Sequence, residues 1–175
     1  MYQDVGKLQY QSLAKIDATP GSDFHNQIIL ASVVDRESGR TRGITAQTAP
    51  LVNKERSIIA SVLFNRLEQG IRWQTNPTVD YGTGFQICEQ TVEIDGCKFL
   101  DDPVFDTLYN TYQVTGYPIG PVTSPSVDNI QAALNPAQTD YLFFVADDTG
   151  KNYFAKTDSD HLQNIKTVKT VNTSL

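Results

Sequence analysis

The feature that most constrains the fold of this chain is a pair of apolar stripes in its first half, each repeated at helical spacing. The first stripe comprises Ile28, Ile29, Leu30, Val33 and Val34, and the second comprises Ile58, Ile59, Val62, Leu63 and Leu67. Residues at these spacings share one face of an α-helix, and that face must be buried against another element. We therefore expect two helices, over about residues 23–37 and 52–69, that pack together, with Asp23 as the cap of the first.

The rest of the chain predicts shorter elements. Residues 71–100, interrupted by Asn76-Pro77, are expected to form loops and short strands. Beyond them we expect a helical turn at 103–108, a short helix capped by Ser126, a hairpin over residues 141–156 and a final helix after Asp158 or Ser159. The predicted fold is α+β: two packed N-terminal helices, a loop-rich middle and a C-terminal β-hairpin plus helix. Residues 1–22 are expected to be a lead-in from a missing upstream region, and residues 23–175 to form a single domain.

Composition and charge exclude several classes of function. A chain of 175 residues can bury about two-thirds of its unfolded surface in one core. Its formal charge of -6 argues against a nucleic-acid partner, because phosphate binding depends on clustered Lys and Arg. No phosphate-binding loop is present either. The longest apolar runs, residues 28–34 and 141–146, are too short to cross a bilayer.

The two cysteines permit a disulfide. Cys88 and Cys97 flank the turn-prone Asp95-Gly96 in a segment that is typical of a short hairpin. A disulfide in an oxidising compartment and a pair of free thiols are both compatible with this spacing. With only His25 and His161 as further ligands, the chain makes a poor zinc set, so no metal is expected.

One acidic residue continues the apolar face of the first predicted helix. Glu37 follows Leu30, Val33 and Val34 at spacings of seven, four and three residues. A carboxyl group against an apolar wall is favoured in its neutral form, as a general acid requires. From spacing alone, a solvent-exposed glutamate at the helix end is the favoured interpretation. Spacing alone also does not choose between Glu37 and Asp35.

Three longer motifs, in order along the chain, resemble those of a known family. They are IILASVVDRESG (28–39), ERSIIASVLFNRLEQGIRWQTNPTVDYGTG (55–84) and the stretch from YNTYQVTGYPIG to GKNYF (109–154). Together they resemble the endolytic murein transglycosylases, the YceG-like or MltG family, over about residues 27–165. His161 matches a histidine near the end of the family's pattern.

The resemblance implies a reaction with one essential residue. Glu37, followed by Ser38, matches the glutamate that serves this family as both acid and base. As acid it would protonate the oxygen of the β-1,4 link between N-acetylmuramic acid and N-acetylglucosamine. As base it would activate the muramic C6 hydroxyl, which closes a 1,6-anhydro ring. No second carboxylate and no cofactor are then needed.

Other residues within the matching stretches are candidates for contact with the glycan. Those expected to bind substrate are Asn65, Gln74, Thr75, Tyr81, Tyr109, Asn110, Thr111, Tyr112 and Ser124, because they offer amides, hydroxyls or flat rings to a sugar. Asp35, Ser38 and Arg66 are expected to support Glu37. Structural roles compete with each of these roles: Asn65 could cap backbone, Arg66 could pair with a surface acid, and the tyrosines could lie in the core.

The resemblance also implies a location and partners. We expect an extracytoplasmic protein, with a parent anchored by one N-terminal transmembrane helix, that acts on peptidoglycan glycan strands beside a peptidoglycan synthase. The chain departs from the family at Asp35, where glutamate is usual, and locally at residues 40–53 and around the two cysteines. Two alternatives remain open. One is a lysozyme-like hydrolase with Asp35 or Asp80 as second carboxylate, and the other is a catalytically silent glycan-binding or cell-division scaffold domain.

Overall fold

The computed structural model describes residues 21–38, 49–84, 86–88 and 97–173. Their elements, in chain order, are α2 (Asp23–Glu37), α3 (Ala49–Glu68), α4 (Asn76–Thr83), β1 (Gln86–Ile87), β2 (Cys97–Lys98), η1 (Pro103–Phe105), α5 (Val127–Leu134), β3 (Phe143–Ala146), β4 (Asn152–Ala155) and α6 (Asp158–Thr173). The α+β class expected from the sequence is confirmed. Within these ranges, no helix has the length and apolar character needed to span a membrane.

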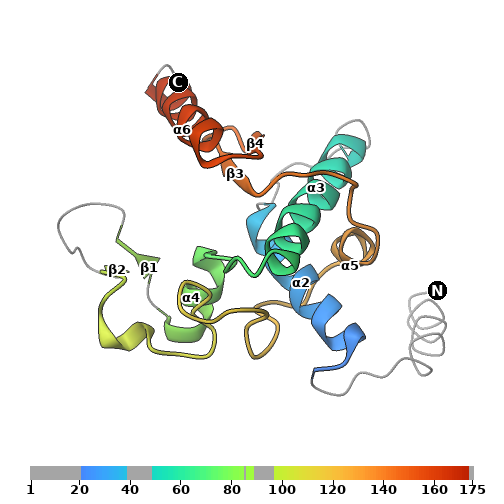
Figure 1. The fold of residues 1–175 in the computed structure, drawn as a ribbon, viewed down its shortest axis with the longest axis vertical. Coiled ribbons are helices and arrows are strands. Elements are labelled where there is room, and N and C mark those ends of the chain that lie inside the picture. The colour runs from blue at the N-terminus through green and yellow to red at the C-terminus, as the bar shows by residue number, and fades with distance from the viewer. Residues whose placement is uncertain (1–20, 39–48, 85, 89–96, 174–175) are drawn as a thin grey trace.

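Helices α2, α3 and α5 pack around one apolar core (Figure 1). The α2 stripe is buried as expected, since Ile29, Leu30, Val33 and Val34 are all at most 2% exposed. It meets the α3 stripe, of which Ile59 and Leu63 are inaccessible to solvent. The predicted packing of these two helices is therefore confirmed, with α5 as a further partner of both.

The cap of the first helix lies one residue earlier than expected. Ser22, in extended backbone conformation, accepts a hydrogen bond through its hydroxyl from the backbone N–H of His25, at 3.2 Å. Asp23 already has helical geometry, so its charge lies in the first turn and not at the cap. The prediction of Asp23 as cap was wrong because a cap must lie just outside the helical backbone, where its side chain can reach the free N–H groups.

Helix α4 lies in the segment that was expected to be loop and short strand. Pro77 occupies its first turn, where a missing N–H costs nothing. Gly84 ends it in the left-handed conformation, with φ of 74°, and its N–H donates to the carbonyl of Asp80 at 2.8 Å. The Pro–Gly spacing is a start and stop signal for a helix, so the prediction of strand here was wrong.

The two cysteines form a disulfide, but the strands beside them do not form the expected hairpin. Cys88 and Cys97 are bonded, with their Cα atoms 5.1 Å apart. β1 and β2 run parallel, with Gln86 opposite Cys97. Each strand has only two residues, too few to impose antiparallel register, and the turn-prone Asp95-Gly96 lies outside the described residues.

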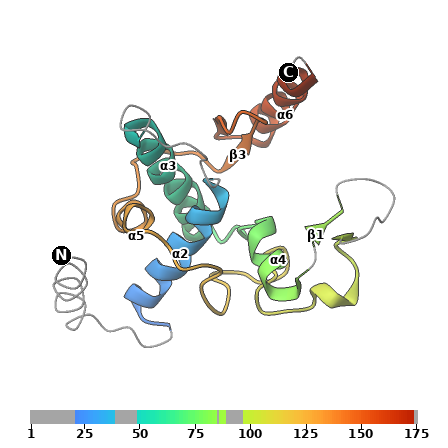
Figure 2. The same ribbon diagram turned by 180° about the vertical axis from the view of Figure 1, so that it is seen from behind.

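The C-terminal elements agree with the prediction. β3 and β4 pair antiparallel from Phe143 opposite Ala155 to Ala146 opposite Asn152. Asp147 closes the turn by accepting backbone hydrogen bonds from Thr149 and Lys151. Helix α6 packs on both strands, and β3 touches α3, so that this group lies beyond the end of the helical core (Figure 2).

Candidate functional site

A pocket of about 400 Å³ lies where the helical core meets the C-terminal hairpin. Its walls come from the end of α2, from α3, from the turn before α4, from β3 and from α6. The lining residues are Glu37, Val62, Arg66, Trp73, Gln74, Thr75, Asn76, Leu142, Phe143, Phe144, Asp158 and His161. Residues separated by more than 120 positions in the sequence therefore share one cavity.

Glu37 is the last residue of α2 and lies at this pocket. Its side chain is half-buried above the fully buried Val33 and Val34. The pKa of Glu37 is raised to about 7, chiefly by desolvation and then by the negative charge of Asp80, while the positive charge of the adjacent Arg36 has a smaller, opposite effect. The apolar face predicted this direction. A carboxyl group with this pKa is divided between its two protonation states near neutral pH.

Asp80, on α4, is the second carboxylate of this region. Burial raises its pKa, and its Oδ1 is enclosed with no hydrogen-bond donor among the described residues. The pKa of Tyr112 is raised by burial and then by the negative charges of Glu37 and Asp80. Its hydroxyl donates to Oδ1 of Asn76 at 2.5 Å. Glu37 thus lies in a desolvated, acidic environment.

Arg66 provides the positive charge of the pocket. Its side chain is buried, and its guanidinium donates to the carbonyl oxygens of Arg72 at 2.8 Å and Leu142 at 3.0 Å. The third donor group, Nη2, reaches Oε1 of Gln74 at 2.6 Å. Arg66 is therefore bound to oxygens of two segments, the turn at Arg72 and Gln74 and the chain at Leu142. The ion pair with a surface acid, which the sequence left open for Arg66, is not among these contacts.

Several expected substrate contacts are engaged in holding the protein together. Asn65 donates to the carbonyls of Thr139 at 2.8 Å and Tyr141 at 3.0 Å, which ties α3 to the segment before the hairpin. Asn110 is fully buried and donates to the carbonyl of Phe105. Neither Asn65 nor Asn110 lines the pocket.

Thr111 is likewise buried, in a hydroxyl cluster with Thr75 and Thr78. The Thr78 and Thr111 hydroxyls lie 2.8 Å apart, and Thr111 also accepts from the backbone N–H of Thr75 at 3.1 Å. Of the three, only Thr75 reaches the pocket. The cluster fixes the turn on which Gln74, Thr75 and Asn76 stand.

The remaining candidates lie outside the pocket lining. Tyr81 and Tyr109 meet edge to face with ring centroids 5.0 Å apart, and Tyr81 is 55% exposed. Tyr112 contributes indirectly, through Asn76. Ser124 is exposed and does not line the pocket.

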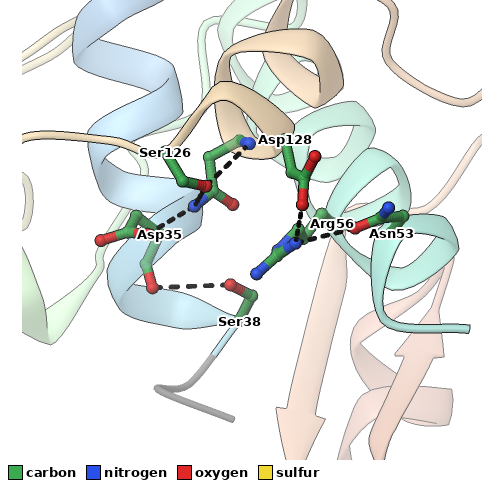
Figure 3. A network of polar contacts seen from close by, with 7 residues as sticks. Asp35, Ser38, Asn53, Arg56, Ser126 and Asp128 are labelled. Atoms are coloured by element: carbon green, nitrogen blue, oxygen red, sulfur yellow. Dashed lines mark hydrogen bonds and ion pairs between the residues drawn. The ribbon is translucent and has the colours of Figure 1, made fainter. Parts of the chain in front are cut away.

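Asp35 faces the opposite side of α2 from the pocket. Its carboxylate accepts hydrogen bonds from the hydroxyl of Thr123, at 3.0 Å, and from the amide of Asn129 on α5. The same amide also donates to Ser126, and the Ser38 hydroxyl donates to the carbonyl of Asp35 (Figure 3). Asp35 therefore attaches the end of α2 to α5, whereas the Ser38 contact lies within the end of α2.

A neighbouring group of contacts joins α3 to α5. Arg56 binds Asn53 at 2.7 Å and Asp128 at 3.3 Å, beside the Asp35 contacts (Figure 3). The last turn of α2, which carries Glu37, is thus attached to α5 through Asp35, and α5 is in turn attached to α3 through Arg56.

The C-terminal wall of the pocket was not predicted. The His161 ring stacks on Phe143, with centroids 5.2 Å apart, and the guanidinium of Arg66 lies 5.5 Å from the Phe143 centroid. Burial lowers the pKa of His161, so it is neutral at pH 7. The match of His161 to a family histidine was the one sequence signal for this wall. Among the residues described, no group of three or more His, Cys, Asp or Glu side chains could hold a metal ion.

Comparison with known proteins identifies relatives. The model of the YceG-like family matches residues 1–167. An endolytic murein transglycosylase of Streptococcus pneumoniae is 33% identical over 139 residues, covering 79% of this chain and 22% of the relative. One of Bacillus subtilis is 33% identical over 137 residues, covering 78% and 32%. The chain thus spans a third or less of the length of these relatives.

A solved structure is similar as well. The crystal structure of a yceG-like protein of Listeria monocytogenes, 31% identical, superimposes with a TM-score of 0.62 over 91% of this chain and 45% of that protein. At this identity the likeness extends to sequence as well as fold.

Proposed function

This chain belongs to the YceG-like family, and from that premise we propose that it is an endolytic lytic transglycosylase of peptidoglycan. The substrate is the β-1,4 link between N-acetylmuramic acid and N-acetylglucosamine. The observation that carries the proposal is Glu37, a carboxyl group with a pKa of about 7 that lines a pocket of about 400 Å³. Relatives that are named endolytic murein transglycosylases support the same reaction.

In the first step Glu37 acts as a general acid. Its neutral form donates a proton to the glycosidic oxygen as the bond to the anomeric carbon breaks and positive charge develops on the sugar. The nearby Asp80 supports this step by keeping the proton on Glu37. The positive charge of the adjacent Arg36 lowers the pKa of Glu37, but by less than the charge of Asp80 raises it.

In the second step the ionised Glu37 acts as a base. It takes the proton of the muramic C6 hydroxyl, whose oxygen attacks the anomeric carbon and closes the 1,6-anhydro ring. One proton leaves Glu37 and one returns, so the residue is regenerated and no water is consumed. The nucleophile belongs to the bound sugar, which gives it a high effective concentration.

Other pocket residues bind and orient the glycan in this proposal. Gln74 and Thr75 contact the sugar, and Arg66 holds Gln74 in place. Phe143 and His161 offer an aromatic wall to a sugar ring. Asn65, Asn110, Thr111, the partly buried Tyr109 and the exposed Tyr81 and Ser124 do not bind substrate directly in this proposal.

The proposed location is outside the cytoplasmic membrane, where peptidoglycan lies. The Cys88–Cys97 disulfide supports an oxidising compartment. An N-terminal membrane anchor on the parent protein and a peptidoglycan synthase as partner are parts of the same proposal.

The test is the mass of the products released from purified sacculi. Lytic cutting produces fragments with anhydromuramic ends, whereas hydrolysis produces reducing ends that are heavier by one water. We expect anhydro ends and a broad range of strand lengths from internal cuts. Reducing ends would instead support the hydrolase with Asp80 as second carboxylate, and bound but uncut glycan would support the scaffold domain.

A further inference from the structure

Gln74 has an uncommon backbone conformation at the pocket wall. It is the one non-glycine residue with positive φ, 56°, in the described ranges. This region is unfavourable for a residue with a side chain, and it persists only where the surroundings enforce it. In this turn the N–H of Gln74 donates to the carbonyl of Thr111 at 3.1 Å, and the N–H of Thr75 donates to the hydroxyl of the same residue. Two hydrogen bonds to Thr111 therefore hold the backbone of this turn in place.

The side chain of Gln74 is also fixed. Its Oε1 accepts from Arg66, and a guanidinium can only donate, so the amide oxygen must face Arg66 and the amide nitrogen must face away. Arg66 itself is only 7% exposed and is bound to two backbone carbonyls. The orientation of the Gln74 carboxamide is therefore imposed by a buried group with no freedom to turn.

The nitrogen of this carboxamide can donate a hydrogen bond to a ligand in the pocket. No residue in the described part of the chain accepts a hydrogen bond from Nε2, although the exposed side chain lines the pocket. The positive charge of Arg66, which donates to the amide oxygen, polarises the carboxamide and makes its N–H a stronger hydrogen-bond donor. Such a donor suits a neutral carbonyl oxygen. In a glycan of N-acetylated sugars, the acetamido carbonyl is the acceptor of this kind on each ring.

We propose that Gln74 is a fixed N–H donor to the acetamido carbonyl of a sugar in this pocket, with Arg66 as its positioning residue. This assignment rests on the glycan substrate proposed above. It makes Gln74 a determinant of specificity for N-acetylated over de-N-acetylated strands.

The test measures binding in the Glu37→Gln background, where the glycan stays uncut. Calorimetry compares peptide-free glycan strands with the same strands after chemical de-N-acetylation. Gln74→Met removes the donor without adding charge, and we expect it to weaken binding of N-acetylated strands by about tenfold, the worth of one hydrogen bond. Binding of de-N-acetylated strands should stay unchanged. Gln113→Met, on an exposed glutamine away from the pocket, is the matched control and should alter neither.

Two further variants separate recognition from folding. Gln74→Gly relaxes the backbone, so it should melt no lower than its parent and yet lose the same affinity. Arg66→Lys keeps the charge without the planar fork, and it should weaken binding of N-acetylated strands. Combined with Gln74→Met, it should add little, because both changes remove the same bond.

An equal loss on both kinds of strand, additive effects of the two variants, or no loss at all would overturn the proposal. Absence of binding by the parent would overturn it as well. The catalytic proposal is judged separately, by the products of the protein with native Glu37. Cutting without dependence on Gln74 contradicts the assignment of Gln74 alone, and Gln74-dependent binding without cutting contradicts the catalytic proposal alone.

Discussion

In the proposed reaction Glu37 first donates a proton, so its pKa should set the alkaline limit of activity. With a pKa of about 7, turnover should fall as the pH rises above that value. Asp80→Asn removes a charge that raises this pKa, and the alkaline limb should then move to lower pH. A pH–rate profile of both proteins measures the shift, with Asp101→Asn at an exposed aspartate as control. A limb that stays in place would mean that Asp80 does not act on Glu37.

The same residue should make the fold less stable at higher pH. Below about pH 4.5 Glu37 is protonated in both the folded and the unfolded chain, and it favours neither. Between pH 4.5 and 7 the unfolded chain releases this proton and the folded chain keeps it, so the free energy of unfolding falls. Glu37→Gln removes this loss. At pH 8 the variant should be more stable than the parent by about 1–3 kcal/mol, less than the full shift because the group is partly solvated.

Urea denaturation at two pH values checks this prediction. At pH 4 the parent and the Glu37→Gln variant should unfold at the same urea concentration. A parent that is the more stable protein at pH 8 would show that the ionised carboxylate is stabilised in the fold, which contradicts the desolvated environment of Glu37.

Single residues differ in how far the sequence predicts them. Glu37 could be placed on an apolar face because helical spacing is local, and the family motif then selected it over Asp35. The conformation of Gln74 could not be predicted, because it depends on Thr111, 37 positions along the chain, and on a buried Arg66. His161 and Phe143 reach the pocket only through the tertiary position of the hairpin.

At the scale of elements, the end of α2 is attached to α5 through Asp35. Asp35→Asn weakens the acceptor that Thr123 and Asn129 share and places an amide against one of these donors. We expect a loss of about 1–3 kcal/mol in the free energy of unfolding, measured by urea denaturation. Cutting per folded molecule should be retained, since Asp35 faces away from the pocket. Unchanged stability would show that this attachment contributes nothing.

The disulfide next to β1 and β2 supports a different part of the fold. The double variant Cys88→Ser/Cys97→Ser should lose about 2–3 kcal/mol of stability, from the loop-closure entropy of a nine-residue separation. Thermal melting with and without reductant measures it: reductant should lower the melting temperature of the parent and leave the double variant unchanged. Equal melting of the parent in both conditions would contradict the prediction.

Elements with a strong local signal were predicted well. The stripes of α2 and α3 and the hairpin around Asp147 have patterns that their own residues determine. Helix α4 was missed because its Pro was interpreted as an interruption, although a proline in the first turn favours a helix. The parallel pairing of β1 and β2 leaves almost no local pattern, since each strand has two residues.

In the whole molecule, the pocket exists because two groups of elements meet. The helical core supplies Glu37 and Arg66, and the C-terminal hairpin with α6 supplies the aromatic wall. Sequence pattern predicted each group but not their meeting, because β3 touches α3 through contacts that no periodicity encodes. The proposed reaction uses this assembled site, with Glu37 as its single acid and base.

The most direct test is the release of anhydromuropeptides from sacculi by variants at equal folded concentration. Glu37→Gln keeps the shape of the side chain but cannot exchange a proton, so release should fall by about 100-fold or more. Asp35→Asn should cost far less. Glu68→Gln, the same change at the exposed end of α3, should cost nothing. If Glu37→Gln still cuts while Asp35→Asn is inactive, the catalytic acid lies on the other face of α2 and the assignment of Glu37 is wrong.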